Sequence, residues 1–130
     1  MWRSGGGRRG QREALEQLVR EATRSGDFLA PWNRQPDIWR HYQDEGEILR
    51  VLQRQWSTEL SGHMFAAMQE GQGDFAQDVA LAFTDAVAHM HGEFRILEAN
   101  AEHPAIAADR RKEQQLLATA GLPFRRTSAR

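Results

Sequence analysis

Histidine and carboxylate residues recur at helical spacing in two parts of this chain, and such side chains are suited to hold a transition-metal ion. Glu59 precedes His63 by four residues, and Asp85, His89 and Glu93 repeat the same spacing further along. Imidazole and carboxylate groups on facing helices are common ligands of metal sites inside helical bundles. The spacing therefore raises a metal-binding hypothesis that depends on where each side chain points.

The direction of each side chain follows from the rotation of about 100° per residue in an α-helix. On this basis Asp85 and His89 point away from the apolar face of their helix, and we interpret them as part of a solvated surface. His63 points into the apolar face of its own helix, where a buried imidazole requires a hydrogen-bonding partner. The simpler interpretation is that His63 has a structural role only. The alternative is a metal- or ligand-binding pocket that His63 forms with Glu45 or Glu59.

The chain contains no cysteine, which excludes disulfide bonds, thiolate metal sites and cysteine nucleophiles. No glycine-rich loop follows a strand in the manner of a phosphate-binding motif, and no catalytic triad can be assigned from the sequence. The sequence therefore gives no positive support for an enzyme, and we expect no cofactor.

The formal net charge is -1 and the isoelectric point is about 6.5, so the whole molecule has no strong attraction for phosphate backbones. Basic residues nevertheless gather near both ends of the chain: Arg8, Arg9, Arg12, Arg110, Arg111, Lys112, Arg125, Arg126 and Arg130. Such ends could bind nucleic acid, but the sequence has no helix-turn-helix signature. Nucleic-acid binding through basic arms is therefore our third hypothesis. The sequence shows no apolar run typical of a signal peptide or a membrane span, so we expect a cytoplasmic protein with no membrane partner.

The strongest helical pattern covers residues 74–100, where apolar residues recur at spacings of three and four. Asp74 is placed to cap its start, with Gln77 three residues later, as in a capping box. The pattern predicts one long helix. It also predicts an antiparallel partner before it, because the glycines at 71 and 73 leave only a short connection.

Three further helices are expected. One covers residues 11–24 and ends at Gly26, and another covers residues 104–120 and ends at Gly121. The third is capped by Asp37, and whether the segment between Ile38 and Glu70 is one helix or two, broken near Ser61 and Gly62, stays open.

Together these elements predict a single all-α domain, a bundle of about four helices with a central antiparallel hairpin. Residues 11–123 form the bundle in this interpretation. Residues 1–10, which are rich in glycine and arginine, are expected to be a flexible arm, and residues 124–130 a basic tail.

Some apolar residues fall outside the predicted core faces. Leu81 and Ile96 lie on the reverse of the 74–100 helix, and Trp32 and Trp39 belong to no assigned face. Apolar and tryptophan side chains on a surface are typical of interfaces between proteins. The function we expect first is therefore a non-enzymatic interaction module, a homodimer or an adaptor, that uses these four residues.

Overall fold

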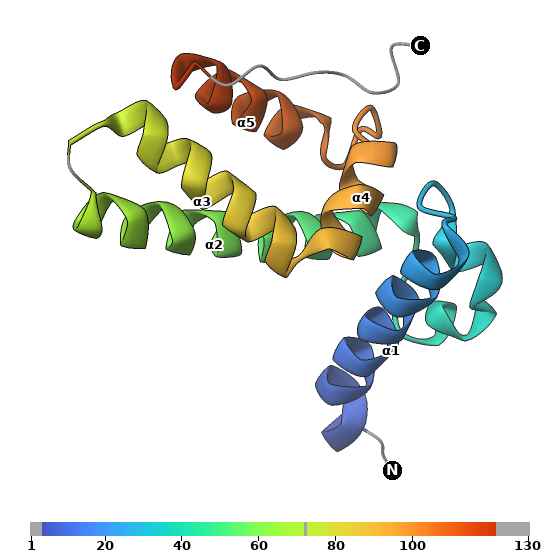
Figure 1. Cartoon of the computed structure of the whole chain (residues 1–130). Helices are drawn as coiled ribbons and strands as arrows, with labels where there is room; N and C mark the ends of the chain where they lie inside the picture. The colour runs from blue at the N-terminus through green and yellow to red at the C-terminus, as the bar shows by residue number, and fades with distance from the viewer. Residues whose placement is uncertain (1–3, 72, 122–130) are drawn as a thin grey trace.

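The computed structural model describes residues 4–71 and 73–121, and all regular structure in them is helical (Figure 1). The elements are α1 (Ser4–Ser25), η1 (Pro31–Arg34), η2 (Pro36–Arg40), α2 (Glu45–Glu70), α3 (Phe75–His89), α4 (His91–Ala99) and α5 (Ala107–Thr119), where η marks a short 3-10 helix. The predicted all-α bundle is confirmed. It has five α-helices in the described residues, one more than expected.

The two helices of the central hairpin, α2 and α3, lie side by side and run in opposite directions (Figure 1). The side chain of Asp74 accepts a hydrogen bond from the backbone N–H of Gln77 at 3.1 Å, as the capping pattern predicts. Gly73 adopts φ of +92°, a left-handed conformation that glycine adopts without steric cost. The local sequence thus determines where α3 begins.

The start of α2 differs from the prediction. Asp37 lies inside η2, and Asp44 caps α2 by accepting a hydrogen bond from the backbone N–H of Glu47 at 2.9 Å. Glu47 in return accepts one from the backbone N–H of Gln43 at 2.6 Å. This reciprocal capping satisfies donors at the helix start, which explains why the helix begins here and not seven residues earlier.

The question of one helix or two before the hairpin turn is answered by α2, which continues without a break through Ser61 and Gly62. A Cβ atom added to Gly62 would meet no heavy atom within 4 Å. The glycine therefore faces open space, and it weakens the helix only through its low helix propensity.

The predicted helix over residues 74–100 is two helices, because the backbone leaves helical geometry at Met90, with φ of -125° and ψ of 48°. Beyond this break α4 turns toward α1 (Figure 1). A Cβ atom on Gly92 would lie 2.6 Å from Cγ1 of Val19, so only glycine allows this close approach. The prediction failed because a contact between distant helices ends the pattern.

Helix α1 begins at Ser4, so residues 4–10, which the sequence assigned to an arm, are helical. At Gln11, where this stretch ends, the helix contacts the segment before α2. The side chain of Gln11 donates a hydrogen bond to the carbonyl of His41 at 2.9 Å, and the hydroxyl of Tyr42 donates one to the carbonyl of Gln11 at 2.9 Å. Residues 1–3 and the predicted tail at 124–130 lie outside the described residues.

The predicted ends of α1 and α5 agree with the structure. Gly26 and Gly121 adopt φ of +80° and +83°, the left-handed conformation expected of a glycine that follows a helix.

The hydrophobic core is centred on Trp56, which is fully buried on α2. Its ring centroid lies 4.9 Å from that of Phe94 on α4 and 6.1 Å from that of Phe83 on α3. Aromatic packing of this kind ties the hairpin to α4.

Helix α5 is joined to the core by a buried ionic network. Arg110, which is 1% exposed, donates to Glu98 Oε2 at 2.5 Å and to Glu113 Oε1 at 3.2 Å, and the indole of Trp56 donates to the same Glu113 oxygen at 2.7 Å. Burial raises the pKa of Glu113, and the charge of Arg110 and the Trp56 hydrogen bond oppose the shift. Arg110 was counted among the basic residues of a nucleic-acid arm, and its burial removes it from that role.

Candidate metal centre

The α2–α3 hairpin brings Glu59, His63 and His89 together. Glu59 Oε2 lies 2.9 Å from His63 Nε2 on the same helix and 2.7 Å from His89 Nδ1 on the facing helix. One ligand atom from each side chain lies within 4.8 Å of the other two. Each imidazole therefore has a nitrogen close to the same carboxylate oxygen, and the contact of His63 is a hydrogen bond.

The two nitrogen-to-oxygen distances are slightly shorter than a metal ion requires, and the two nitrogens lie within 4.8 Å of each other. Zinc and similar ions bind imidazole nitrogen and carboxylate oxygen at about 2.0–2.2 Å, which places neighbouring ligand atoms about 3.0 to 3.5 Å apart. To admit an ion, the carboxylate oxygen would have to move a few tenths of an ångström away from both nitrogens, a shift on the order of side-chain motion. Two histidines and one carboxylate suit Zn²⁺ or Fe²⁺ and leave coordination positions open for water or a ligand.

The cluster lies at the edge of the bundle, where water has access. The side chains of Glu59 and His63 are 29% and 28% exposed, and that of His89 is 70% exposed. His63 and Glu59 share a hydrogen bond, and a metal ion, which binds an unprotonated imidazole nitrogen, would take the place of the proton between them. Binding at this site would therefore release protons and weaken in acid.

Comparisons with known proteins find no relative that bears on this site. No family model, curated protein or solved structure matches the chain. Within residues 4–71 and 73–121, no helix has the length and hydropathy needed to cross a membrane.

The structure separates the two carboxylates that the sequence proposed as partners of His63. Glu59 lies beside His63, one helical turn away. Glu45 is the first residue of the same continuous helix, and at 1.5 Å per residue it lies about 27 Å from His63 along the axis. Glu45 is therefore excluded from this site.

His89 was interpreted as a solvated residue that points away from any site. It is indeed exposed, yet it also reaches Glu59 across the hairpin. The buried residues Ala82 and Ala86 precede it at spacings of seven and three on the same face of α3. The sequence prediction located the buried face of this helix from its large apolar side chains. The spacing of the small residues Ala82 and Ala86 would have placed His89 on the face toward α2.

The four residues predicted to form an interaction surface divide into two pairs. Ile96 and Trp32 are 0% and 3% exposed and pack in the core of their own chain, so their assignment to an interface was wrong. The break at Met90 turned Ile96 inward, and η1 buries Trp32 against the bundle. Leu81 and Trp39 are 54% and 41% exposed.

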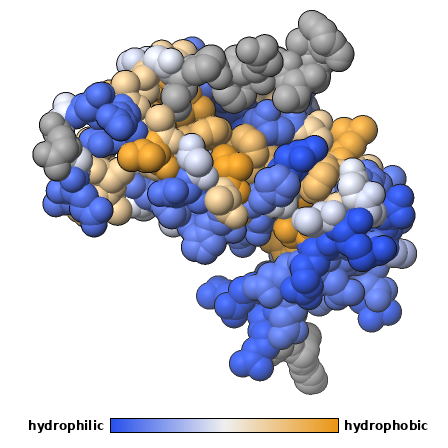
Figure 2. Space-filling view, in the orientation of Figure 1, coloured by the Kyte–Doolittle hydropathy of each residue, from blue (hydrophilic) through white to orange (hydrophobic). Residues whose placement is uncertain are grey.

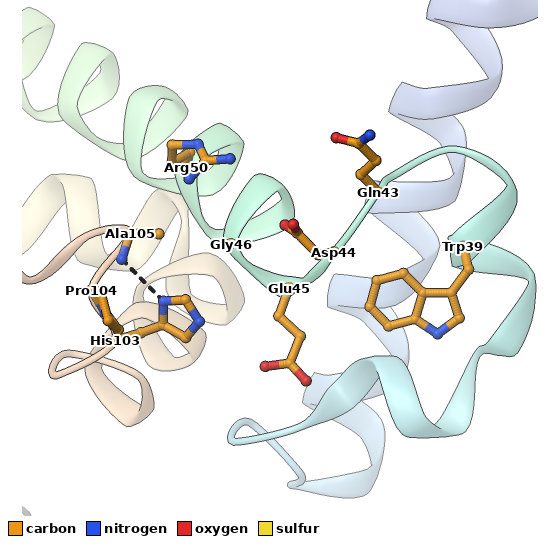
Figure 3. A pocket seen from close by; sticks show the side chains of 9 residues that line it. All are labelled: Trp39, Gln43, Asp44, Glu45, Gly46, Arg50, His103, Pro104 and Ala105. Carbon is orange, nitrogen blue, oxygen red and sulfur yellow. Dashed lines mark hydrogen bonds between the residues drawn. The ribbon is translucent and has the colours of Figure 1, made fainter.

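A cavity of about 690 Å³ at the start of α2 holds the exposed ring of Trp39 and the side chain of Glu45, which lies between Trp39 and His103 (Figure 3). Two of its polar groups are used locally. Asp44 caps α2, and His103 Nδ1 accepts a hydrogen bond from the backbone N–H of Ala105 at 3.1 Å. These groups support the backbone, and among the residues that the structure describes no three potential metal ligands meet at this cavity.

Proposed function

We propose that this protein binds a divalent transition-metal ion, Zn²⁺ or Fe²⁺, through Glu59, His63 and His89. The observation that carries the proposal is the convergence of two imidazole nitrogens on one carboxylate oxygen, at 2.9 and 2.7 Å, from two helices. An ion held by these three groups keeps open positions, which suit either catalysis or recognition of a further ligand.

Metal binding at this position would also stabilise the hairpin, because Glu59 and His63 belong to α2 and His89 belongs to α3. A ligand that binds only the folded state adds about 2.7 kcal/mol to the free energy of unfolding when its concentration is one hundred times the dissociation constant. Metal affinity and thermal stability should therefore change together in variants of the site.

The proposal is tested by isothermal titration of the metal-free protein with Zn²⁺, together with its melting temperature. We expect one ion per chain for the wild type. Replacing His63→Ala or His89→Ala should lower the affinity by at least about tenfold, as expected for the loss of a ligand. His91→Ala is the matched control, because this histidine lies on α4 just beyond the cluster.

Two results would contradict the metal proposal. One is a wild-type protein that binds no ion at micromolar concentration. The other is a control variant, His91→Ala, that loses as much affinity as His89→Ala, because such a loss would assign binding to the histidine-rich segment and not to the triad.

A protein-interaction module, homodimeric or adaptor, is the second candidate function. It is supported by large exposed apolar residues in the described part of the chain: Leu29, Trp39, Phe65, Met68, Phe75 and Leu81. Hydrophobic atoms are visible over the hairpin in Figure 2, whereas the surface over α1 is hydrophilic. A dimer in light scattering that Leu81→Asp converts to a monomer would support this candidate, and a monomeric wild type would end the homodimer form. For either function we propose a cytoplasmic location.

A further inference from the structure

Helix α5 packs on the α2–α3 hairpin and runs toward the hairpin turn (Figure 1). Near its end, Leu117 and Ala120 form a buried cluster with Val79 of α3. Met64 of α2 packs against this cluster, so both helices of the hairpin contribute to it. The last turn of α5 is therefore held by apolar contacts with the hairpin.

The apolar face under α5 continues beyond the end of that helix. Met68 lies one turn after Met64 on α2, and Phe75 lies one turn before Val79 on α3. Both are therefore about 6 Å closer to the hairpin turn and on nearly the same faces as the residues that α5 covers. Their exposed fractions are 52% and 44%. Met68 and Phe75 thus form an apolar patch, which we call the hairpin-end patch, just beyond α5.

The residues that follow α5 in the sequence match this patch in chemistry. Gly121 adopts φ of +83°, and its backbone N–H donates to the carbonyl of Ala118 at 2.9 Å, one of the two hydrogen bonds of a Schellman motif. In this motif the residue after the glycine, here Leu122, commonly packs against the position that Leu117 occupies. Phe124 follows two residues later. Three residues span about 10 Å when extended, which is longer than one helical turn.

The charges around the patch and in the following segment are complementary. Residues 55–94 contain six carboxylates and no arginine or lysine. Three of the six flank the turn of the hairpin: Glu70, Asp74 and Asp78. Arg125 and Arg126 come directly after Phe124. A segment with two apolar side chains followed by two arginines suits a surface with an apolar centre and an acidic rim.

We propose that residues 122–126 dock on the hairpin-end patch of their own chain, with Leu122 and Phe124 against Met68 and Phe75 and the two arginines beside the acidic turn. The chain's own segment is favoured over a second copy because α5 ends next to the patch, which gives the segment a high effective concentration there. The inference is independent of the proposed metal centre, since none of these residues is a ligand of that centre.

The test follows the oxidation of Met68 by hydrogen peroxide in the full chain, measured by mass spectrometry of peptides. Peroxide converts an accessible thioether to the sulfoxide, so a docked segment slows the reaction at Met68. The double variant Leu122→Ser with Phe124→Ser should oxidise at Met68 at least about threefold faster than the wild type, as expected if the segment is docked about two-thirds of the time. Met90, at the break between α3 and α4, is the internal reference and should react equally in both proteins.

Three further variants assign the contacts. In a Phe75→Ser background, the two serine substitutions in the segment should no longer change the rate at Met68, because the partner surface is already lost. Arg125→Gln with Arg126→Gln should raise the rate at low salt, where the attraction of the acidic turn is strongest. Leu29→Ser is the matched control, because Leu29 is 62% exposed and lies in the loop after α1. Its rate at Met68 should equal that of the wild type.

Protein concentration separates the chain's own segment from a second copy. Protection of Met68 that stays constant over about a hundredfold dilution supports docking within one chain, because mass action affects only contacts between molecules. Protection that disappears on dilution would assign the patch to a second copy and overturn the proposal. Equal rates at Met68 in the wild type and the serine double variant would also overturn it.

Discussion

Replacing Arg110 by methionine is expected to lower the free energy of unfolding by about 3–5 kcal/mol, the cost of breaking a buried ion pair from one side. Arg110 is 1% exposed and holds Glu98 and Glu113 at 2.5 and 3.2 Å. Methionine keeps the aliphatic part of the arginine side chain and carries no charge, so Glu113 keeps the hydrogen bond of the Trp56 indole and loses its charged partner. The predicted loss therefore comes from an unpaired carboxylate and not from a cavity.

The double variant Arg110→Met with Glu113→Gln distinguishes these two causes. The amide oxygen of glutamine keeps an acceptor for the indole of Trp56, and the buried charge is gone. We expect the double variant to recover at least half of the lost stability, because the penalty of an unpaired charge far exceeds that of a neutral amide.

Urea unfolding followed by tryptophan fluorescence measures both variants, with an unchanged slope as the sign that the transition stays two-state. Arg111→Met, at the exposed neighbouring position, is the control and should change stability by less than about 0.5 kcal/mol. The reasoning is refuted if Arg110→Met costs no more than this control. It is also refuted if the double variant recovers nothing.

Three further predictions follow from the same contacts. Burial raises the pKa of Glu113, so the folded state binds the proton of this carboxyl group more tightly than the unfolded state does. Protonation of Glu113 therefore stabilises the fold at low pH, and this stabilisation is lost as pH rises from 4.5 through the raised pKa. The urea midpoint of the wild type should fall over this pH range, and Glu113→Gln should remove that fall. Gly92→Ala should destabilise the protein by about 1–3 kcal/mol by overpacking against Val19, whereas Gly62→Ala should stabilise it by up to about 1 kcal/mol, both read from thermal melts. Zinc affinity should fall in acidic buffer, because zinc must displace protons, and an affinity independent of pH would argue against imidazole ligands.

The local features of this fold were accessible from the sequence. The cap at Asp74, the glycines that end α1 and α5, and the adjacency of Glu59 and His63 each depend on residues within a few positions of one another. Such features follow from local backbone geometry and hydrogen bonding, which can be predicted from residue type and spacing.

The remaining features depend on contacts between distant segments. The break at Met90 follows from the close approach of Gly92 to Val19, which lie on different helices, and the periodicity of the 74–100 segment gives no sign of it. Arg110 and Glu113 are spaced on α5 as buried residues are, but charged side chains are normally exposed, so Arg110 was counted among the basic residues of an arm. Both errors arise where tertiary packing overrides a local preference.

The most direct test of the metal centre is a long-range ¹H–¹⁵N NMR spectrum of the histidine side chains, recorded with and without one equivalent of Zn²⁺. The geometry predicts that zinc shifts Nε2 of His63 and Nδ1 of His89, since these nitrogens face Glu59. The nitrogens of His91 should not change. Shifts at the opposite ring nitrogens, or no shift at either residue, would contradict the proposed site.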